Sequence, residues 1–580
     1  MRDKEYTLVI LGIFAPGPNP SAVLLIDGKI VSWAEEERFN RIKTAPNSFP
    51  IKSTKWCLEY AGINLDDVDK IAYGWDSPSY ITETKDFLLS QKKKFFDDSV
   101  YNNLQEELLL NLYHPDRIKY QLQIGLGSLS ADRKIPEVVF FKHHECHVAS
   151  AFYSSGFSEG NILSIDGSGE EVSTLLCYAS NNKIEVIKSF KLPDTLGGFY
   201  ATFTEFLGFR AYHDEGKVMG LASYGKYQEK LQQKLDKFIP FDADTGEFTL
   251  NPHLRYVGDH TYGSRYTDEF VEIFGKPRGK ESALESQYAD LAFAIQYRLE
   301  KIVNSLASWL HIQTGSRNLC LAGGVAMNCV MNGHLAQMEC VDNIFVQPAS
   351  SDNGVSLGAA QLLNMREGVE KNQKMNHAYW GPEFSEDDII KALNESKLRY
   401  KKSKNICFEV AEKIKDGKIV GWFQGKMEVG ARALGNRSIL ASPLISDMKD
   451  KINLEVKHRE DWRPFCPSIK EEAYDKYIDA STDSPYMIMA FPVREEFRSI
   501  TPAVVHVDGT ARPQAVSKKY NPKFWGLLNE FEKLTGHPVL LNSSFNIQGE
   551  PIVCSPSDAL RTFGATGLDI LAIGDFILEK

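Results

Sequence analysis

The sequence predicts an internally duplicated α/β fold followed by a second domain of α+β character. The first observation is an apolar strand–turn–strand unit at residues 7–26, whose turn at 15–20 is rich in Gly and Pro and which is followed by a third strand after the Asp27-Gly28 turn. The second is a similar unit at 161–180, NILSIDGSGEEVSTLLCYAS, with a glycine-rich acidic turn. The third is a polar stretch with Gly and Pro at 366–388, which is typical of a linker.

We expect the two domains to cover residues 1–370 and 371–580. Within the first domain, residues 84–123 have a polar helical pattern that indicates an insertion or a lid, and residues 281–315 predict a long amphipathic helix. The other expected elements are a helix ended by Gly62, a strand running into a helix at 138–157, and strand–turn–helix units at 318–335 and 343–363.

Composition limits the class of protein. The net charge of −11 over 580 residues argues against a broad surface for nucleic acid or membrane, which would be basic. No apolar stretch approaches the roughly 20 residues needed to span a bilayer, and the N-terminus is not patterned as a signal peptide. The nine scattered cysteines indicate buried free thiols in a reducing compartment, so we expect a cytoplasmic enzyme.

Three histidines lie in the segment HHECHVASAF. His143 and His147 are four residues apart, so on a helix both rings point the same way and can share one metal ion. Asp352, in the loop PASSDNGVSLG, is the candidate third ligand because a glycine-rich loop after a strand exposes its carboxylate. Alternatively, the histidines form a surface or capping group, and Asp352 is the N-cap of the next helix.

Two glycine-rich turns suit a phosphate. Asp166, in SIDGSGEE, could position a metal-bound water or hold a phosphate-bound cation, although Asp-Gly is also a strong signal for a tight hairpin turn. Gly323 and Gly324 would allow close approach of an adenosine or phosphate. The segment 214–225, DEGKVMGLASYG, suits a binding loop or, alternatively, the acidic start of a helix.

The second domain holds several basic segments rich in glycine. The run MEVGARALGNRSIL at 427–440 carries Arg432 and Arg437, whose planar guanidinium groups match the oxygen pairs of a phosphate or carboxylate. Alternatively, each such residue forms a surface salt bridge. Further segments of the same character supply Lys457, Arg459, Arg463, His506, Arg512, Asn542, Ser543, Ser544 and Asn546. Together they predict a site for a small, highly charged phosphate.

Eight ordered motifs, covering nearly the whole chain, resemble the NodU/CmcH family of O-carbamoyltransferases. They are EEERFNRIK (35–43), HHECHVASAF (143–152), DEGKVMGLA (214–222), AGGVAMN (322–328), GKMEVGARALGNRSIL (425–440), VKHREDWRPFCPS (456–468), HVDGTARPQ (506–514) and LLNSSFNIQGEPIV (540–553).

The resemblance implies an actin-like, TsaD-like first domain and a YrdC-like second domain. It implies that the second domain converts carbamoyl phosphate and ATP, with Mg²⁺, to carbamoyl-adenylate. The first domain would then transfer the carbamoyl group to a hydroxyl of a small-molecule acceptor, such as a sugar or a natural product made as an antibiotic. A homodimer is expected from the family.

The resemblance also implies roles for individual residues. His143, His147 and Asp352 would hold the metal, iron(II) by analogy or another divalent ion. The expected site for carbamoyl phosphate and ATP comprises Arg432, Lys457, Arg463, Arg512, Asn542, Ser544, Gly323, Gly324 and Asn328. The candidate catalytic residues are Asp166, His213, Arg432 and Lys457.

One departure from the family is expected to matter. Family members usually carry His-Asp in the first Gly-rich turn, where this chain has Pro18 and Asn19. If that histidine helps to deprotonate the acceptor hydroxyl, another group must act here, and His213 is the candidate. The acceptor pocket is expected to be shaped by residues 84–123 and 253–270.

Two other functions compete with this one. TsaD and YrdC relatives modify tRNA adenosine together, but the acidic charge and the fusion of both domains argue against RNA as the substrate. A degenerate, non-catalytic binding protein is suggested by the missing His-Asp pair. The retained Arg432, Lys457, Arg463 and Arg512 argue against that alternative.

Overall fold

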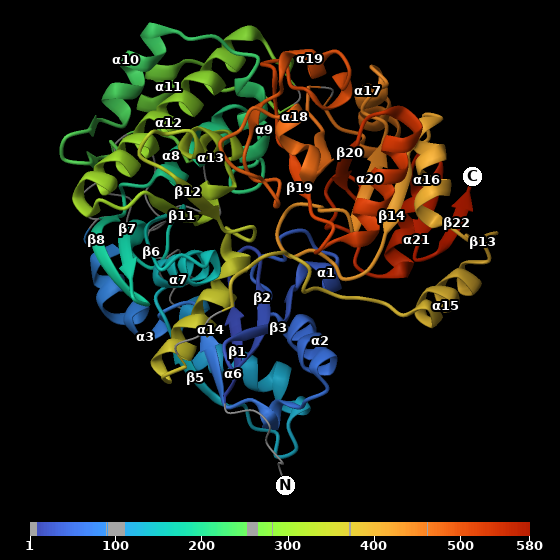
Figure 1. The fold of residues 1–580 in the computed structure, drawn as a ribbon. Coiled ribbons are helices and arrows are strands. Elements are labelled where there is room, and N and C mark those ends of the chain that lie inside the picture. Colours follow the sequence, from blue (N-terminus) through green and yellow to red (C-terminus); the bar gives the residue numbers. More distant parts are fainter. Residues whose placement is uncertain are drawn as a thin grey trace. The chain divides into compact units, whose positions relative to one another are not determined.

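The computed structural model describes residues 8–88, 90, 111–251, 254, 265–280, 282–369, 373–460 and 462–580. Most of the predicted insertion at 84–123 and of the predicted pocket loop at 253–270 therefore lies outside the described residues. The chain divides into two compact units (Figure 1). Unit 1 comprises Met1–Ser32 and Pro46–Lys374, and unit 2 comprises Trp33–Ala45 and Met375–Lys580.

Unit 1 contains two five-stranded sheets with the same topology, of which only the last residues of β3, Trp33–Glu35, belong to unit 2. The first has the order β3-β2-β1-β4-β5, and the second has the order β8-β7-β6-β11-β12. In each, a central strand pairs antiparallel with the next strand in sequence and parallel with a later one. The strands are β1 Val9–Phe14, β2 Ser21–Ile26, β3 Lys29–Glu35, β4 Lys70–Tyr73, β5 Glu137–Phe140, β6 Glu159–Ile165, β7 Val172–Ser180, β8 Lys183–Lys191, β11 Asn318–Ala322 and β12 Asn343–Val346. The predicted internal duplication is confirmed.

The helices of unit 1 also agree with the sequence patterns. They include α2 Ile51–Ala61, α6 Pro115–Leu126, α7 His143–Ser155, α8 Leu196–Phe206, α9 Glu215–Ala222, α12 Ser286–Thr314, α13 Cys329–Ala336 and α14 Val355–Arg366. Gly62 ends α2 in the left-handed conformation, with φ of 67°, as its position predicted. The segment at 214–225 begins a helix, α9, and is therefore not an open binding loop.

Two helices, α7 and α14, lie between the sheets of unit 1 (Figure 1). Helix α7 packs on β6 and β11, whereas α14 packs on β1 and on α7 itself. The contact between the helices is close, because a β-carbon at Gly358 would overlap the carbonyl oxygen of Cys146. This packing fixes the position of α7, which carries the three adjacent histidines.

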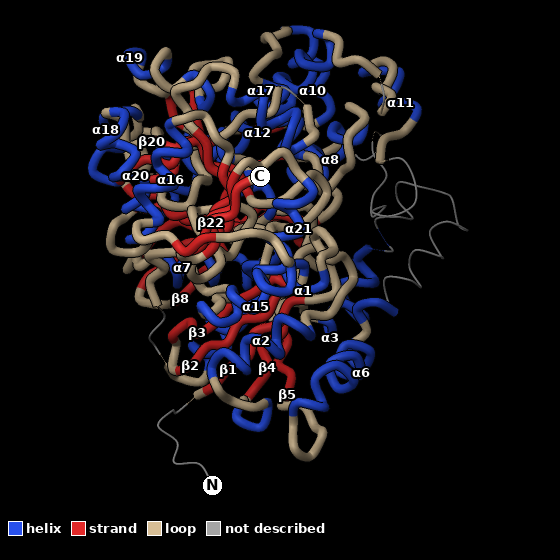
Figure 2. The backbone as a smooth tube through the Cα atoms, turned by 90° about the vertical axis from the view of Figure 1, so that its right-hand side faces the viewer, coloured by secondary structure: helices blue, strands red, loops and turns tan. Residues whose placement is uncertain are grey.

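Unit 2 is built on one mixed sheet of eight strands, in the order β13-β22-β21-β14-β15-β20-β16-β19. Helices α16 and α20 cover one face, and α15 and α21 cover the other; Figure 2 shows α16 and α20 on the opposite side of the sheet from α21. The strands and helices are β13 Lys401–Lys402, β14 Val420–Phe423, β15 Arg437–Ala441, β16 Cys466–Lys470, β19 Gln514–Val516, β20 Val539–Ser544, β21 Ile570–Ile573, β22 Phe576–Glu579, α15 Glu386–Ser396, α16 Ile406–Lys415, α20 Pro522–Thr535 and α21 Pro556–Ala565.

The cysteines and the helices bear on two predictions made from composition. All nine cysteines are free, and seven of them are buried, in agreement with the prediction of free thiols. Among the described residues, no helix is long and apolar enough to cross a membrane.

Candidate metal centre and anion site

Helix α7 brings two histidine rings together. His143 and His147 stand one turn apart on the same face, and their Nε2 atoms are 3.1 Å apart. Both side chains are almost fully buried. His144 points elsewhere and places its Nδ1 2.8 Å from the hydroxyl of Ser164. Of the three adjacent histidines, two therefore face one point.

Two carboxylates approach the same point from other elements. Asp166 follows β6, and its Oδ2 lies 3.0 Å from Nε2 of His147. Asp352 follows β12, and its Oδ1 lies 3.5 Å from Nε2 of His143 and 3.8 Å from Nε2 of His147. Gly354, not Asp352, is the N-cap of α14, so the carboxylate is directed at the histidines and does not cap the helix.

The Asp166 carboxylate is held by backbone donors. The N–H of Gly167 donates to Oδ1 at 2.6 Å, and the N–H of Gly324 donates to Oδ2 at 3.0 Å. A β-carbon at Gly324 would lie 3.0 Å from Oδ1, so the second glycine of the Gly-Gly turn permits this close approach. The two glycine-rich turns, predicted separately from the sequence, are thus adjacent in space.

His143, His147, Asp166 and Asp352 form a set that can hold a metal ion, since one ligand atom from each lies within 4.8 Å of all the others. Burial lowers the pKa of His143, but the Asp352 and Asp166 carboxylates outweigh it and raise that pKa to about 9. Burial raises the pKa of Asp352. Two imidazole nitrogens at 3.1 Å need a proton or a cation between them. The donor set fits a borderline divalent ion such as iron or zinc.

The first Gly-rich turn lies beside this cluster. A β-carbon at Gly17 would be 3.7 Å from Oδ2 of Asp352, and the Asn19 side chain donates to the hydroxyl of Ser351 at 3.4 Å. The positions at which the family usually carries His-Asp are therefore close to the candidate metal ligands. In this chain they present a proline and a neutral amide.

Asn328 and His213 are two further residues predicted to act in unit 1. Asn328 caps α13 by accepting from the N–H of Met331, and it exchanges hydrogen bonds with the Gln296 side chain. His213 lies in the turn between α8 and α9, next to Tyr212, whose ring would be 3.1 Å from a β-carbon at Gly167. This turn is thus adjacent to the Asp166 hairpin.

A second cluster of polar groups lies in unit 2 around Lys457. This lysine is buried, and its Nζ donates to the Asn546 side chain at 2.9 Å and to the backbone carbonyls of Ser544 and Asn546. Burial, together with the charges of Arg459 and Arg463, holds the pKa of Lys457 well below its usual value. Basic side chains are thus gathered around one buried amine, an arrangement that favours an anionic ligand, which would restore the charge of the lysine.

The other residues of unit 2 predicted to bind the anion have the following contacts. Arg512 directs Nε and Nη2 at the sulfur of Cys466, at 3.2 and 3.0 Å. Arg463 places Nη1 3.7 Å from the Glu460 carboxylate. The Asn542 side chain donates to the hydroxyl of Ser468 at 2.9 Å. The Ser544 hydroxyl donates to the side chain of Asn546 at 2.7 Å, next to Lys457.

The prediction that Arg437 binds an anion with Arg432 is wrong. Arg437 has no exposed surface, and its guanidinium donates to the carbonyls of Gln424 and Pro382. It also stacks on Phe423, with its central carbon 3.7 Å from the ring centroid. Arg437 holds the loop together from inside, because a buried guanidinium must satisfy its donors within the protein.

The structure adds residues that sequence reasoning did not assign to this site. Glu35 and Arg38 belong to unit 2 and contact Gly430, two residues before Arg432. The charge of Lys43, in the same segment, also lowers the pKa of Lys457. The motif EEERFNRIK was the available signal, because three acidic residues directly before three basic ones can pair with each other when they are buried.

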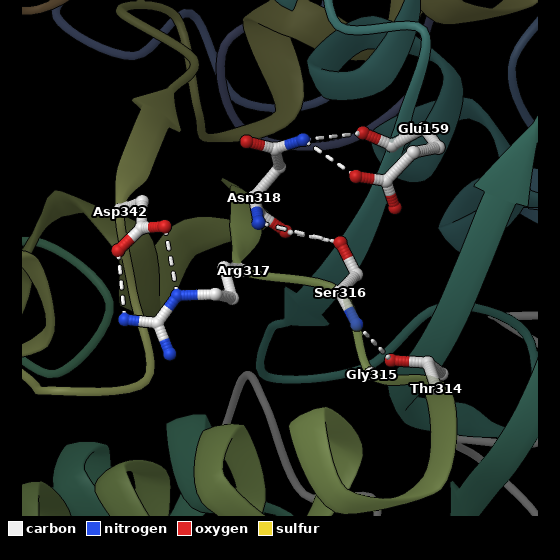
Figure 3. A pocket seen from close by; sticks show the side chains of 7 residues that line it. All are labelled: Glu159, Thr314, Gly315, Ser316, Arg317, Asn318 and Asp342. Atoms are coloured by element: carbon white, nitrogen blue, oxygen red, sulfur yellow. Dashed lines mark hydrogen bonds and ion pairs between the residues drawn. The ribbon is translucent and has the colours of Figure 1, made fainter.

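A surface hollow elsewhere in unit 1 does not meet these groups (Figure 3). It is lined by Glu159, Thr314, Gly315, Ser316, Arg317, Asn318 and Asp342. Its polar groups pair with each other: Arg317 binds Asp342 through two contacts of 2.7 Å, and Asn318 donates to Glu159. It lies where β6, β11 and β12 begin, whereas Asp166 and Asp352 follow the ends at which ligands bind in such sheets.

Comparison with known proteins assigns the chain to a family. The model of the carbamoyltransferase N-terminus matches residues 10–361, and that of the carbamoyltransferase C-terminus matches residues 411–580. The chain belongs to the carbamoyltransferase family, as its motifs predicted. It is an enzyme that transfers a carbamoyl group.

Relatives in the same family span most of the chain. Nodulation protein NolNO of Sinorhizobium fredii is 37% identical, over 97% of this chain and 78% of the relative. Nodulation protein NolO of Bradyrhizobium diazoefficiens is 39% identical, over 76% of this chain and 78% of the relative. The uncharacterized protein sll1178 of Synechocystis is 37% identical, over 98% of this chain and 96% of the relative.

Proposed function

We propose that unit 2 activates carbamoyl phosphate with Mg²⁺-ATP, and that unit 1 transfers the carbamoyl group to a hydroxyl of a small-molecule acceptor. The observation that carries this proposal is the buried lysine among arginines in unit 2, since such a site matches a small polyanion. In this proposal the segment 1–370 is a TsaD-like, actin-type domain and 371–580 is a YrdC-like domain.

The proposed reaction has three steps: hydrolysis, adenylation and transfer. Water cleaves carbamoyl phosphate to carbamate and inorganic phosphate. A carbamate oxygen then attacks the α-phosphorus of ATP, which forms carbamoyl-adenylate and expels pyrophosphate. The acceptor oxygen finally attacks the carbamoyl carbon, AMP leaves, and the hydroxyl proton passes to a base.

The residues of unit 2 serve the first two steps. Arg432, Lys457, Arg463 and Arg512 neutralise the charge that develops on the phosphate oxygens, and Asn542 and Ser544 orient the ligand through hydrogen bonds. Lys457 is held at a depressed pKa, so an incoming anion favours its protonated form and binding is accompanied by proton uptake. Activation matters because carbamate itself is a poor electrophile, whereas the adenylate carries a good leaving group.

The residues of unit 1 serve the transfer step. His143, His147 and Asp352, with Asp166 beside them, would hold a divalent ion, iron(II) or another, which supplies Lewis acidity toward an oxygen of the substrate. Gly323, Gly324 and Asn328 border the nucleotide in this proposal. His213 takes the acceptor proton, in place of the His-Asp pair usual in the family.

The test is AMP formation from ATP with and without carbamoyl phosphate, in the absence of acceptor. AMP that depends on carbamoyl phosphate is expected, and Arg463→Ala should abolish it. His213→Gln should leave this half-reaction intact while slowing transfer once an acceptor is known. Folded protein that binds ATP but forms no AMP under any of these conditions would overturn the activation step.

A further inference from the structure

We propose that Glu35 and Arg38 are positioning residues for carbamoyl phosphate activation, because they hold the loop that presents Arg432. The inference rests on the proposed function, in which Arg432 binds the phosphate. It assigns the segment 33–45, which precedes most of unit 1 in sequence, to the assembly of the anion site in unit 2.

The backbone N–H and the backbone carbonyl of one loop residue, Gly430, are both held by this segment. The Oε1 atom of Glu35 accepts from the N–H of Gly430 at 2.7 Å. The Nη2 atom of Arg38 donates to the carbonyl of Gly430 at 2.8 Å. Gly430 adopts φ of 93°, a conformation that favours glycine, so these contacts select a specific backbone geometry just before Arg432.

The two side chains belong to a buried ionic group. Arg38 is 3.3 Å from Glu35 through Nε and 2.9 Å from Glu37 through Nη1. All three side chains are buried or nearly so. A buried ionic group is costly when incomplete, and here it is completed by the backbone of Gly430. The loop therefore has one strongly preferred position relative to the segment.

The other end of the loop is held by a different carboxylate. Oε1 of Glu428 accepts from the N–H groups of Leu434 and Asn436 at 2.7 Å each, and from that of Arg437 at 3.2 Å. Arg432 lies between these two anchors. Its guanidinium is thus carried on a short stretch of backbone whose two ends are fixed by buried charges.

The same segment provides a matched control. Arg41 also donates to backbone carbonyls, but to those of Pro551 and Ile552, at 2.8 and 2.7 Å, and it approaches Asp558. Arg41→Lys thus perturbs the same segment through a different loop. Arg38→Lys keeps the charge but loses the planar fork that reaches Glu35, Glu37 and Gly430 together.

The kinetic test is a double-mutant cycle with Arg432→Lys, read as the KM for carbamoyl phosphate in AMP formation. Arg38→Lys should raise the KM for carbamoyl phosphate about tenfold in the wild-type background. It should have little further effect in the Arg432→Lys background, because in this proposal Arg38 acts only through the contact of Arg432 with the phosphate. Arg41→Lys should combine multiplicatively with Arg432→Lys. Multiplicative behaviour of Arg38→Lys would overturn the inference.

Hydrogen exchange tests whether Glu35 and Arg38 hold the loop, independently of the proposed activity. Arg38→Lys and Glu35→Gln should accelerate amide exchange in residues 428–437 by about tenfold or more, with β14 and residues 438–441 of β15 unchanged as a check on folding. Arg41→Lys should accelerate residues 550–554 instead. Unchanged exchange at 428–437 would refute the positioning role, whether or not the wild-type protein forms AMP.

Discussion

At the residue scale, His143, His144 and His147 are neighbours in sequence that face different partners. The first and third meet two carboxylates, whereas the second meets the hydroxyl of Ser164. Burial, with the nearby charges of His143 and His147, holds the pKa of His144 well below its usual range. His144 is therefore a natural control for the metal ligands.

Substitution of one proposed ligand should reduce metal binding. His147→Ala is expected to lower the iron bound per chain by about tenfold or more after reconstitution, because one of the four candidate donors is lost. The measurement is elemental analysis of the desalted protein. His144→Gln should keep most of its metal, and equal loss in both variants would contradict the assignment of ligands.

Glu215 makes stability depend on pH. Burial, with Asp214 nearby, raises the pKa of Glu215 to about 7, from an ordinary value near 4.5. Below pH 4.5 the carboxyl is protonated in both the folded and the unfolded state. Between 4.5 and 7 only the unfolded chain gains by ionising, so the free energy of unfolding decreases as pH rises, by at most about 3 kcal/mol.

Glu215→Gln should remove this loss of stability, since its amide oxygen can still accept from the N–H of Tyr212. The Tm of the variant, relative to the wild type, is expected to increase between pH 5 and pH 8, and thermal scans at both values would measure it. A Tm difference that is the same at both pH values would show that ionisation of Glu215 is not the cause.

At the scale of elements, the candidate metal centre depends on how α7 packs against α14. The histidines lie on α7, and Asp352 lies three residues before the start of α14. Gly358 of α14 lies against the backbone of Cys146, which is between His143 and His147 in sequence. The distance between the helices thus sets the distance between the ligands.

Gly358→Ala should therefore affect both stability and metal affinity. The added methyl group must displace α14 from α7, at a cost of about 1–3 kcal/mol, and it should weaken metal binding without changing any ligand. Melting temperature and a metal titration would measure the two effects. Gly216→Ala on α9, where a β-carbon meets open space, should leave metal affinity unchanged and should not lower stability.

At the scale of the whole molecule, the two candidate sites lie in different units. The four possible metal ligands belong to unit 1, and Lys457 with its neighbours belongs to unit 2. Apart from residues 33–45, which belong to unit 2 but fall within the N-terminal model, the division follows the two family models. In the proposed function, activation and transfer are therefore separable by mutation.

The two half-reactions, AMP formation and carbamoyl transfer, should therefore respond differently to substitutions in the two units. His147→Ala is expected to keep carbamoyl-phosphate-dependent AMP formation within about threefold of the wild-type rate and to lose transfer, whereas Lys457→Met should lose both. Quantifying AMP, and the carbamoylated product of any acceptor found by screening, provides the measurement. Loss of AMP formation in His147→Ala would show that the steps are not divided in this way.

The sequence was sufficient for the features that depend on neighbouring residues. Alternation of apolar residues predicted the repeated strand–turn–strand units, and Gly62 predicted the end of α2, because these patterns reflect local backbone preferences. The spacing of His143 and His147 predicted a shared ligand face because helical geometry alone places them together. Motif order was enough to indicate the carbamoyltransferase family.

Tertiary structure alone decided the features that depend on distant contacts. It brought the N–H of Gly324 to Asp166, 158 residues away, and Glu35 to Gly430, 395 residues away. It also turned Arg437 inward while neighbouring Arg432 stayed partly exposed. No local pattern distinguishes two arginines five residues apart, because the burial of each is set by the carbonyls and rings that the rest of the fold supplies.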